Sequence, residues 1–439
     1  MKQFISTAAL LCTTATCLAQ FGVFQPSESF TYTDEGSGRN VVCLTDTTKN
    51  DKFLYQTDPM FTADGKYIIF RSSSRTDMRI EVPTQDGKGT RQITPTLYYF
   101  IELSSGKIIQ ATNDAKIANV YLGNKSNKLF YNKREEDNSW KLYVMDLDKY
   151  FADAKKGKAK SAAKYETLLG TYPANTESPG NFCVSCDDQW AYITVQRKGT
   201  PEEIEAMNAK AFKPLDNQPI KVQPTLSGIR KMNLSTGEVT KVVDLDFRVG
   251  HIQSSRFRPE EIVFCNETGG DANQRMWFCT ADGSTLKPLY VETPLDWVTH
   301  ETFASEDFVY FNVLGFQDRL RKQASGIFRI NLRNDDIEVM GQVELDKDVK
   351  TQLVGRGFWH CNATRDKKWT TGDTFGGSVW IIDVETGHRY KMASDAKMTP
   401  DHAQPFFSPD GKTLFYQSGH FASGKRLNLM KIEIDANIK

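Results

Sequence analysis

The chain has 439 residues, and its 55 Lys and Arg are balanced by 55 Asp and Glu, so the formal net charge is zero. A chain of this length holds either two or three ordinary domains or one large repeat architecture, with ample core in both cases. The neutral balance removes the usual electrostatic argument for a nucleic-acid or anionic-membrane partner, and we expect neither.

The N-terminus, MKQFISTAALLCTTATCLAQ, has the form of a secretory signal peptide. Lys2 supplies a positive region, residues 4–11 an apolar region, and the small residues ending at Ala19 a cleavage site. TATC lacks the apolar residue expected three positions before a lipidated Cys17, so we expect simple cleavage after residue 19. No other segment is long and apolar enough to cross a membrane. We predict an exported mature protein, periplasmic in a Gram-negative cell, formed by residues 20–439.

The cysteines left after cleavage are scattered along a large chain that needs no disulfide staples, even though an oxidising compartment permits them. Cys183 and Cys186 form a lone C-x-x-C, without a second pair for zinc or a βαβ context for redox chemistry. We therefore expect buried, structural cysteines. They are Cys43, Cys183, Cys186, Cys265, Cys279 and Cys361.

Seven segments share a polar turn followed by a short run of aromatic and β-branched residues, which is a hairpin signature. FTADGKYIIF, from Phe61, is nearly repeated as FSPDGKTLFY from Phe407. Most of them are followed by a second strand–turn–strand pattern, so each unit supplies four short strands. Seven such units predict an all-β, seven-bladed β-propeller, and a two-sheet sandwich explains the regular hairpins less well. The other five segments begin at Gly123, Val184, Phe257, Phe303 and Asn362.

The two ends of the chain complement one another. The segment Leu427–Ile434 supplies a third strand after the seventh hairpin, and Arg39–Asp46 offers the missing outer strand. We expect N- and C-terminal strands to close the last blade, because closure removes exposed sheet edges.

Two insertions interrupt the repeats. Residues 148–166 are basic and polar, and we expect a solvated loop. Residues 199–212 open with Thr-Pro-Glu-Glu, which predicts a short surface helix. The Pro-rich residues 213–225 that follow are either loop decoration or a flap beside a site.

Histidines recur at one phase of the repeat. In a propeller, the first strand of each blade lines the central channel. His300, His360 and Gln404 each stand six residues before the acidic residue of the next turn, and His402 lies two before Gln404 on the same strand face. We expect these side chains to converge at the channel mouth, where they suit either a divalent transition metal or a proton and a sugar carboxylate. The phase of His251 is less regular, and any single histidine could instead fill a polar core position.

The C-terminal half carries a set of motifs that belong together. The stretch VGHIQSSRFRPEEIVFCNETGGDANQRMWFCTADGS, then VTHETF and HAQPFFSPDGKTLFY, resembles oligogalacturonate lyase of polysaccharide lyase family 22. The shared motifs are G-H, F-C-x-E, R-M-W-F, T-H-E and the last His-containing segment before F-x-P-D. The resemblance is clear from residue 230 onward, whereas the first half shares mostly the blade pattern. It implies a seven-bladed propeller that cleaves galacturonate oligosaccharides by β-elimination with a bound divalent ion, for which Mn²⁺ is the first candidate.

The resemblance carries over residue by residue. The T-H-E histidine of the family's metal site matches His300, and the first histidine of its last segment matches His402. The second histidine of that segment is Gln404 here, and the family's glutamine ligand falls at Thr399, so two of four ligand positions depart from the pattern. The metal ligands implied are His300, His402 and Gln404, with His360 as a further contributor.

The resemblance also implies the catalytic residues. The G-H histidine matches His251, the expected base, and Arg230 is the nearest candidate for the family's arginine, with Arg248 as another. A lyase for a 4-linked uronate must remove the C5 proton and expel the C4 oxygen, so it needs a base that works near neutral pH and a cation for the substrate carboxylate. The stem of Arg230 could instead only cover a strand face.

Two alternatives stay open. One is a lyase for another uronate linkage, of the rhamnose–glucuronate or ulvan type. The other is a non-catalytic periplasmic propeller that binds a glycan or a protein, although a scaffold has no need for four histidines at the channel mouth. The family enzyme is usually cytoplasmic, whereas this chain carries an export signal. The sugar, endo or exo action and the oligomeric state are not determined by the sequence.

Overall fold

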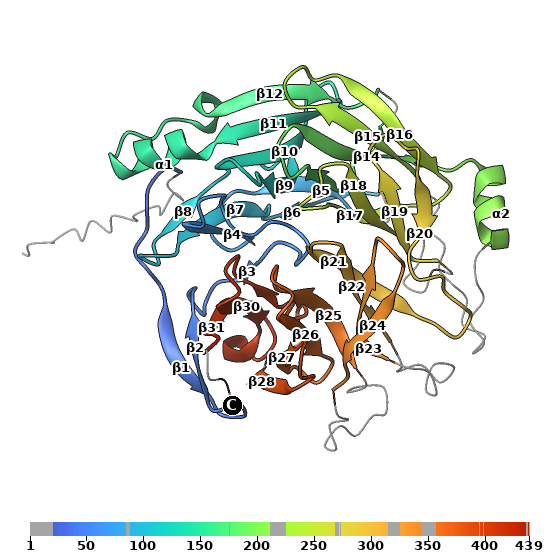
Figure 1. Cartoon of the computed structure of the whole chain (residues 1–439). Coiled ribbons are helices and arrows are strands. Elements are labelled where there is room, and N and C mark those ends of the chain that lie inside the picture. The colour runs from blue at the N-terminus through green and yellow to red at the C-terminus, as the bar shows by residue number, and fades with distance from the viewer. Residues whose placement is uncertain are drawn as a thin grey trace, which may run out of the picture.

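Seven β-sheets stand around a central axis as the blades of a propeller in the computed structural model (Figure 1). Six blades have four strands and the seventh has five. The fold predicted from the repeats is therefore confirmed. The predicted signal peptide and residues 211–224 of the suspected flap lie outside the described residues. The structure describes residues 21–84, 88–174, 176–210, 225–267, 272, 274–314, 325–343, 357–394, 396–397, 399–435 and 438.

The first three blades follow the chain in order, and each begins with its innermost strand. Blade 1 contains β3 (Asp51–Lys52), β4 (Tyr67–Ser72), β7 (Leu97–Glu102) and β8 (Ile108–Gln110), and the hairpin β5 (Ile80–Pro83) and β6 (Thr90–Ile93) projects from it. Blade 2 contains β9 (Ile117–Leu122), β10 (Lys128–Arg134), β11 (Trp140–Asp146) and β12 (Glu166–Thr171). Blade 3 contains β13 (Phe182–Val184), β14 (Trp190–Lys198), β15 (Thr225–Asn233) and β16 (Val239–Leu245).

The next three blades repeat this order. Blade 4 contains β17 (Val249–Ser254), β18 (Glu261–Asn266), β19 (Met276–Thr280) and β20 (Leu286–Pro288). Blade 5 contains β21 (Val298–Ser305), β22 (Phe308–Val313), β23 (Gly326–Asn331) and β24 (Ile337–Gly341). Blade 6 contains β25 (Phe358–Ala363), β26 (Trp369–Thr374), β27 (Val379–Asp383) and β28 (Arg389–Ala393).

Blade 7 is built from both ends of the chain, as predicted. Its C-terminal strands are β29 (Phe406–Phe407), β30 (Thr413–Ser418) and β31 (Asn428–Glu433), and β2 (Arg39–Cys43) pairs antiparallel with β31. A further outer strand, β1 (Phe30–Asp34), pairs with β2. The strand pairs close the ring without leaving the edge of β31 exposed.

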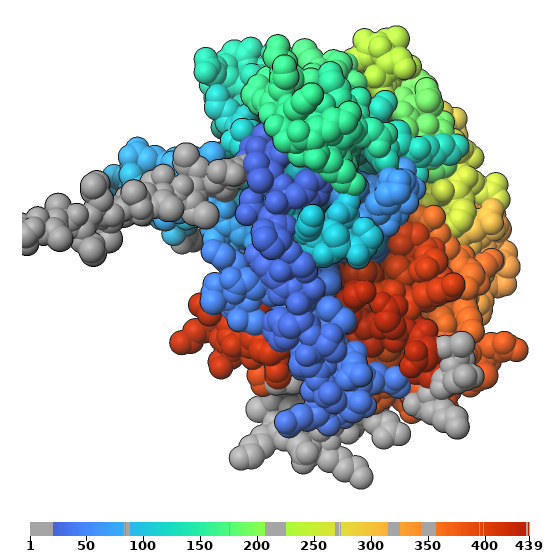
Figure 2. All heavy atoms as spheres, turned by 90° about the vertical axis from the view of Figure 1, so that its left-hand side faces the viewer, coloured from blue at the N-terminus to red at the C-terminus, as the bar shows by residue number. Residues whose placement is uncertain are grey.

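The N-terminal segment does more than close blade 7. Gln25 forms an isolated bridge with Ile108 of β8, and the amide of Gly22 donates to the hydroxyl of Tyr150 at 3.1 Å. Figure 2 shows this segment in blue as a band that runs down the side of the molecule toward the red C-terminal strands. One stretch of chain therefore ties the outer edges of three blades together.

Two α-helices lie outside the blades in the part of the chain that the structure describes. Helix α2 (Pro201–Lys210) confirms the predicted surface helix. The expectation of a solvated loop at residues 148–166 is wrong in part, because α1 (Leu147–Lys155) lies there and buries Tyr150 and Phe151 in the core of blades 1 and 2. The apolar residues recur at helical spacing, and Asp146 caps the N-terminus by accepting from the amide of Lys149. Short 3₁₀ turns lie at Ala162–Lys164 and His420–Ala422.

The turn between the first two strands of a blade depends on one acidic residue. Asp64 and Asp410 accept from a hydroxyl at the end of the inner strand and from a backbone amide two residues on. The residue after each acid has a positive φ and is glycine, Gly65 or Gly411, where a side chain would be strained. This geometry explains the recurring D-G pair.

Blades bury both of their faces against neighbouring blades, so their first and second strands show little alternation between buried and exposed residues. Every residue of β18, β21 and β26 is buried. The described cysteines are all buried and free, as expected. No described helix is long and apolar enough to span a membrane.

Candidate active site

The inner strands of blades 4 to 6 bring the predicted histidines to one end of the channel. His251, His300 and His360 are each the third residue of β17, β21 and β25. The ring centroids of His300 and His360 lie 4.2 Å apart, and those of His360 and His402 lie 5.3 Å apart. His402 precedes β29 of blade 7. Four consecutive blades therefore contribute one imidazole each.

Tyr55 of blade 1 joins His251 to this group. Its ring centroid lies 4.6 Å from that of His251 and 6.0 Å from that of His360. Burial, with a smaller contribution from Glu301, raises the pKa of Tyr55 well above its usual range. Its hydroxyl therefore stays protonated at neutral pH.

The backbone departs from regular strand geometry at these residues. His251, His300 and Gln404 have φ values of 44°, 57° and 48°, which side chains seldom adopt. The pairing register shifts around His251 in β17 and around His300 in β21. Bulges of this kind re-aim side chains, and they are common beside functional sites.

The glycine before His251 is required by close packing. A Cβ on Gly250 would lie 2.0 Å from Cγ of Glu267. Only glycine lets the carboxylate of Glu267 approach β17, which gives a physical reason for the G-H pair.

His251 is held by a buried carboxylate. Its Nδ1 lies 3.1 Å from Oε1 of Glu301, and its Nε2 lies 3.6 Å from Oε1 of Glu267, which is too long for a hydrogen bond. Burial opposes ionisation of Glu301, but Arg275 and His251 outweigh it and lower the pKa of Glu301 to about 2. An ionised Glu301 can accept a proton from Nδ1, and in the neutral imidazole this leaves Nε2 as the nitrogen that can take up a proton.

Arg275 neutralises these carboxylates. Its side chain is buried, with Nη2 at 2.7 Å from Oε1 of Glu267 and Nε at 3.3 Å from Oε2 of Glu301. Burial disfavours the charged guanidinium, yet Cys265, Glu301 and Glu267 keep its pKa well above the usual range. Because both neighbouring carboxylates engage Arg275, it is a structural cation rather than one free for a ligand.

A second carboxylate holds His360. Asp373 accepts from the backbone amide of His360 at 2.8 Å, and both of its oxygens lie 3.1 Å from Nδ1. It also accepts from the backbone amide of Gln404 at 3.1 Å. Burial raises the pKa of Asp373. His360, His402 and the backbone amide of Gln404 together outweigh burial, so the pKa lies below its usual range. Asp373 thereby fixes the ring of His360 and the backbone of blade 7 together.

Three buried ligand atoms lack a hydrogen-bond partner among the described residues. They are Nδ1 of His300, Nδ1 of His402 and Oε1 of Gln404. Burial lowers the pKa of both histidines, that of His300 far below its usual range, so both imidazoles are neutral at pH 7. An unsatisfied buried polar atom costs about 1–3 kcal/mol, and three together point to a missing partner.

These residues fit a divalent transition metal. Neutral imidazole nitrogens and an amide oxygen are suitable ligands for Mn²⁺ and related ions. His360, Asp373 and His402 also offer ligand atoms that all lie within 4.8 Å of one another. The carboxylate–imidazole pair of Asp373 and His360 resembles the outer partners that orient histidine ligands in metal sites.

A second group, His251, Cys265 and Glu267, has ligand atoms at similar spacing. It fits a metal less well. Burial raises the pKa of the Cys265 thiol well above its usual range, and Arg275 already holds Glu267. The surroundings of this group therefore suit proton transfer better than metal binding.

Arg230 lies elsewhere in blade 3. Its guanidinium pairs with Oδ1 of Asp244 at 2.6 Å and donates to the carbonyls of Ile229 and Val243 at 3.1 Å. None of its described contacts reaches His251. Its pocket nevertheless borders the start of β17, because Ser227 in that pocket accepts from the amide of Val249.

Several side chains of the candidate site were not predicted from the sequence. Glu267, Arg275 and Glu301 all lie inside motifs quoted for the family resemblance, F-C-x-E, R-M-W-F and T-H-E, which were the available signals. Asp373 and Tyr55 belong to no such motif. They are found only when the blades are assembled.

The site can now be set beside known proteins. No family model matches the chain. Over 209 residues it is 25% identical to an oligogalacturonate lyase of Dickeya dadantii (strain 3937), and the match covers 43% of this chain and 51% of that relative. The match thus spans about half of the curated relative's length. The resemblance to oligogalacturonate lyase is confirmed.

Solved structures agree over nearly the whole chain. An oligogalacturonate lyase in complex with manganese has a TM-score of 0.69 at 18% identity, covering 95% of this chain and 99% of its own. An oligogalacturonate lyase from Vibrio parahaemolyticus has a TM-score of 0.69 at 16% identity, covering 96% and 100%. At these identities the likeness establishes the propeller fold alone.

Proposed function

We propose that this protein is a polysaccharide lyase that cleaves a 4-linked uronate glycan, of the oligogalacturonate type, by β-elimination. The observation that carries the proposal is the meeting of a carboxylate-bound histidine with three unpartnered metal-ligand atoms at one end of the channel. The sequence similarity to an oligogalacturonate lyase supports the same reaction.

His251 is proposed as the base. Glu301 holds Nδ1, so Nε2 is the atom that takes the C5 proton of the uronate. The electron pair of the C–H bond then forms the C4–C5 double bond, and the C4–O bond breaks with its electron pair on the leaving oxygen, which takes up a proton from the His251 imidazolium or from water. Glu301 also stabilises the imidazolium that this step creates, in the way a buried carboxylate supports a catalytic histidine.

The substrate carboxylate needs a cation while the C5 proton leaves. We propose that His300, His402 and Gln404 hold a divalent ion, Mn²⁺ first, with His360 positioned by Asp373 as a further ligand. When bound, such an ion neutralises charge that develops on the carboxylate. Arg275 cannot take this role while it is engaged by Glu267 and Glu301.

Arg230 is the second proposed neutraliser, and its role depends on access. It lies in a pocket that borders β17, but Asp244 engages its guanidinium. A substrate carboxylate would have to displace Asp244 to reach it. We therefore expect the variant Arg230→Gln to lose less activity than any variant of His251.

The proposal is tested by absorbance near 230 nm, where a conjugated unsaturated uronate absorbs. Mature protein is incubated with oligogalacturonates and with rhamnose–glucuronate and ulvan-type oligosaccharides, with added Mn²⁺ and with chelator. A rise on oligogalacturonate supports the proposal, and a rise on another uronate alone moves the substrate to that linkage. A flat trace from folded protein on the whole panel would contradict a lyase.

We also propose that the N-terminal segment directs export of the protein, to the periplasm in a Gram-negative cell. Fractionation of cells expressing the full chain tests it. We expect mature protein starting at Gln20 in the periplasm. An uncleaved protein in the cytoplasm would contradict it.

A further inference from the structure

The other end of the channel holds a second pocket. The histidines stand near the starts of the inner strands, whereas Arg256 and Arg365 follow the ends of β17 and β25 by two residues. Because the inner strands of the blades run in the same direction, the two groups lie at opposite ends of the channel. Arg256, Arg365 and Asp58 line this pocket together.

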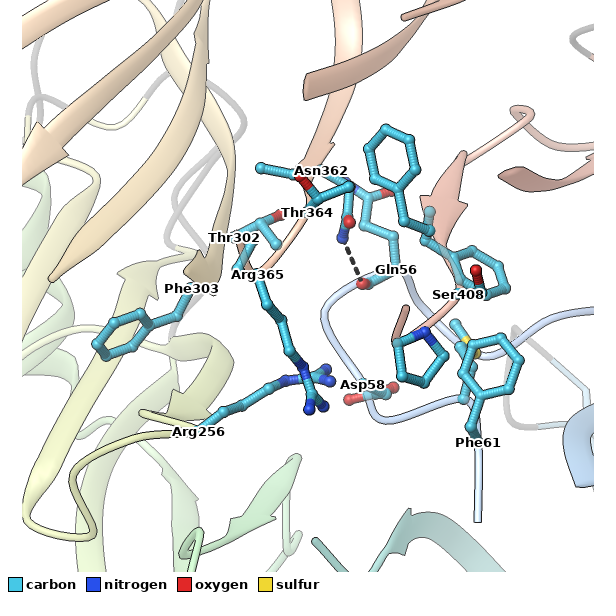
Figure 3. Close-up of a pocket in the computed structure, with 16 residues that line it drawn as sticks. Gln56, Asp58, Phe61, Arg256, Thr302, Phe303, Asn362, Thr364, Arg365 and Ser408 are labelled. Atoms are coloured by element: carbon cyan, nitrogen blue, oxygen red, sulfur yellow. Dashed lines mark hydrogen bonds between the residues drawn. The ribbon is translucent and has the colours of Figure 1, made fainter. Parts of the chain in front are cut away.

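Two guanidinium groups meet in this pocket. Figure 3 shows Arg256 and Arg365 reaching into it from blades 4 and 6 and ending close together, beside the carboxylate of Asp58. Neither guanidinium forms a hydrogen bond or an ion pair with any residue that the structure describes, although the charge of Arg256 acts on Asp58. Partial burial of its guanidinium, and next the repulsion by Arg256, lowers the pKa of Arg365 to about 10, although the residue as a whole is exposed, so Arg365 remains charged at neutral pH.

Asp58 does not balance these charges. Burial raises its pKa to about 6, against the opposing effects of Arg71, His251 and Arg256. Its single carboxylate therefore faces several cations, and the pocket keeps a net positive charge. Like charges that converge without a counter-ion cost free energy, which a bound anion would recover.

We propose that this pocket binds one small oxyanion between Arg256 and Arg365, at a site separate from the histidines. Guanidinium groups bind carboxylate and phosphate oxygens in a planar, bidentate manner, which suits an oxyanion better than a halide. The free space is about 50 Å³, enough for one oxyanion group but not for a sugar ring.

The walls of the pocket support a charged head group with an apolar surround. Phe61, Phe303 and Phe406 also line the pocket. Apolar walls lower the local dielectric and strengthen the attraction between a guanidinium and an anion. The ligand is either a free inorganic ion or the carboxylate of a short uronate that enters from this end.

A polar belt links this pocket to the histidine end. Gln56 donates to the carbonyl of Cys361 at 3.4 Å, and its own carbonyl accepts from Asn362 at 3.2 Å, the bond dashed in Figure 3. Cys361 Sγ donates to the carbonyl of His300 at 3.4 Å. Hydrogen bonds therefore run from Gln56, which lines the arginine pocket, to the backbone of His300, a proposed metal ligand.

Calorimetric titration and thermal melting with inorganic phosphate test the site in mature protein without metal. We expect one phosphate to bind per chain and the melting temperature to rise with phosphate concentration. Arg365→Gln should bind phosphate more weakly by about 10-fold or more. Arg91→Gln is the matched control, because Arg91 is exposed on the β5–β6 hairpin. Asp58→Asn should tighten binding, since it removes the competing negative charge.

The outcomes separate cleanly. Equal phosphate responses in wild type, Arg365→Gln and Arg91→Gln would mean non-specific binding and overturn the proposal, as would the absence of a response to both phosphate and galacturonate. Arg256→Gln repeats the test from the other blade if Arg365→Gln does not fold. Galacturonate in place of phosphate identifies the source: binding by galacturonate alone assigns a uronate carboxylate, and binding by both assigns a general oxyanion. None of these readouts depends on lyase activity.

Discussion

Two histidine–carboxylate pairs from blades 4 to 6 look alike and are set in different surroundings. In each pair Nδ1 lies 3.1 Å from a buried carboxylate oxygen, of Glu301 for His251 and of Asp373 for His360. The side chain of His251 is 20% exposed, whereas that of His360 is 2% exposed. The same pair can therefore serve two tasks, and its neighbours decide which.

The neighbours differ in charge. His251 lies beside Glu267 and Arg275, a carboxylate and its counter-ion, and part of its side chain is exposed to solvent. His360 lies among other imidazoles, with the rings of His300 and His402 within 4.2 Å and 5.3 Å. A proton acceptor needs access to the substrate, while a metal site needs several neutral donors around one point. We propose from this comparison that the first pair transfers the proton and that the second takes part in metal binding.

The largest expected effect comes from His251→Ala. Removal of the base should lower kcat/KM by roughly 10²–10⁴-fold or more, because general base catalysis contributes about that much. His388→Ala is the matched control, since His388 is exposed in the β27–β28 turn. Full activity in His251→Ala would remove this histidine from the reaction.

The second effect concerns metal affinity. His402→Ala deletes one of the unpartnered ligand atoms, so Mn²⁺ affinity by calorimetry should fall by more than the roughly 10–100-fold that loss of an outer partner costs. His251→Ala should leave this affinity unchanged. An unaltered Mn²⁺ isotherm in His402→Ala would place the ion elsewhere.

A gain of affinity is expected from Gln404→His. Imidazole is a stronger donor to transition metals than a neutral amide oxygen, and the Oε1 it replaces has no described partner. Mn²⁺ affinity should rise several-fold. The comparison variant in the same blade is Gln417→His, because the native Gln417 side chain donates to the carbonyl of His402. Weaker binding would show that Gln404 does not face the ion.

The smallest effect is on stability at the arginine end. The pKa of Asp58 is raised to about 6 in the folded protein from an ordinary value of 3.8. Between these values the folded state holds a proton that the unfolded state has lost, so the free energy of unfolding falls as pH rises from about 4 to 6. Denaturant titrations across this range should show a shallower fall in Asp58→Asn. Identical slopes would contradict the raised pKa.

Much of the fold was predictable because its signals are local. The Asp-Gly turns at Asp64 and Asp410 and the terminal strands that meet in blade 7 are visible as sequence patterns. The helix α1 was not predicted, because the many lysines of residues 148–166 indicate a solvated loop. Leu147, Tyr150, Phe151 and Ala154 nevertheless recur at helical spacing.

The site was predictable only where the repeat phase held. His300 and His360 share one position in their strands and were found together. Glu301 was missed because strand alternation points it away from His300, whereas the positive φ of His300 and the bulge in β21 break that alternation. The partnership of His360 with Asp373 depends on pairing across two strands, which no local pattern states.

The division of labour between the two pairs is tested most directly by Glu301→Gln and Asp373→Asn, each measured for Mn²⁺ affinity and for kcat at saturating Mn²⁺. We expect Glu301→Gln to have a lower kcat and an unchanged affinity for Mn²⁺. Asp373→Asn should bind Mn²⁺ roughly 10–100-fold more weakly and recover its rate when Mn²⁺ is raised. If both variants changed the same quantity, or if their effects were exchanged, the assignment of base and metal to the two pairs would be wrong.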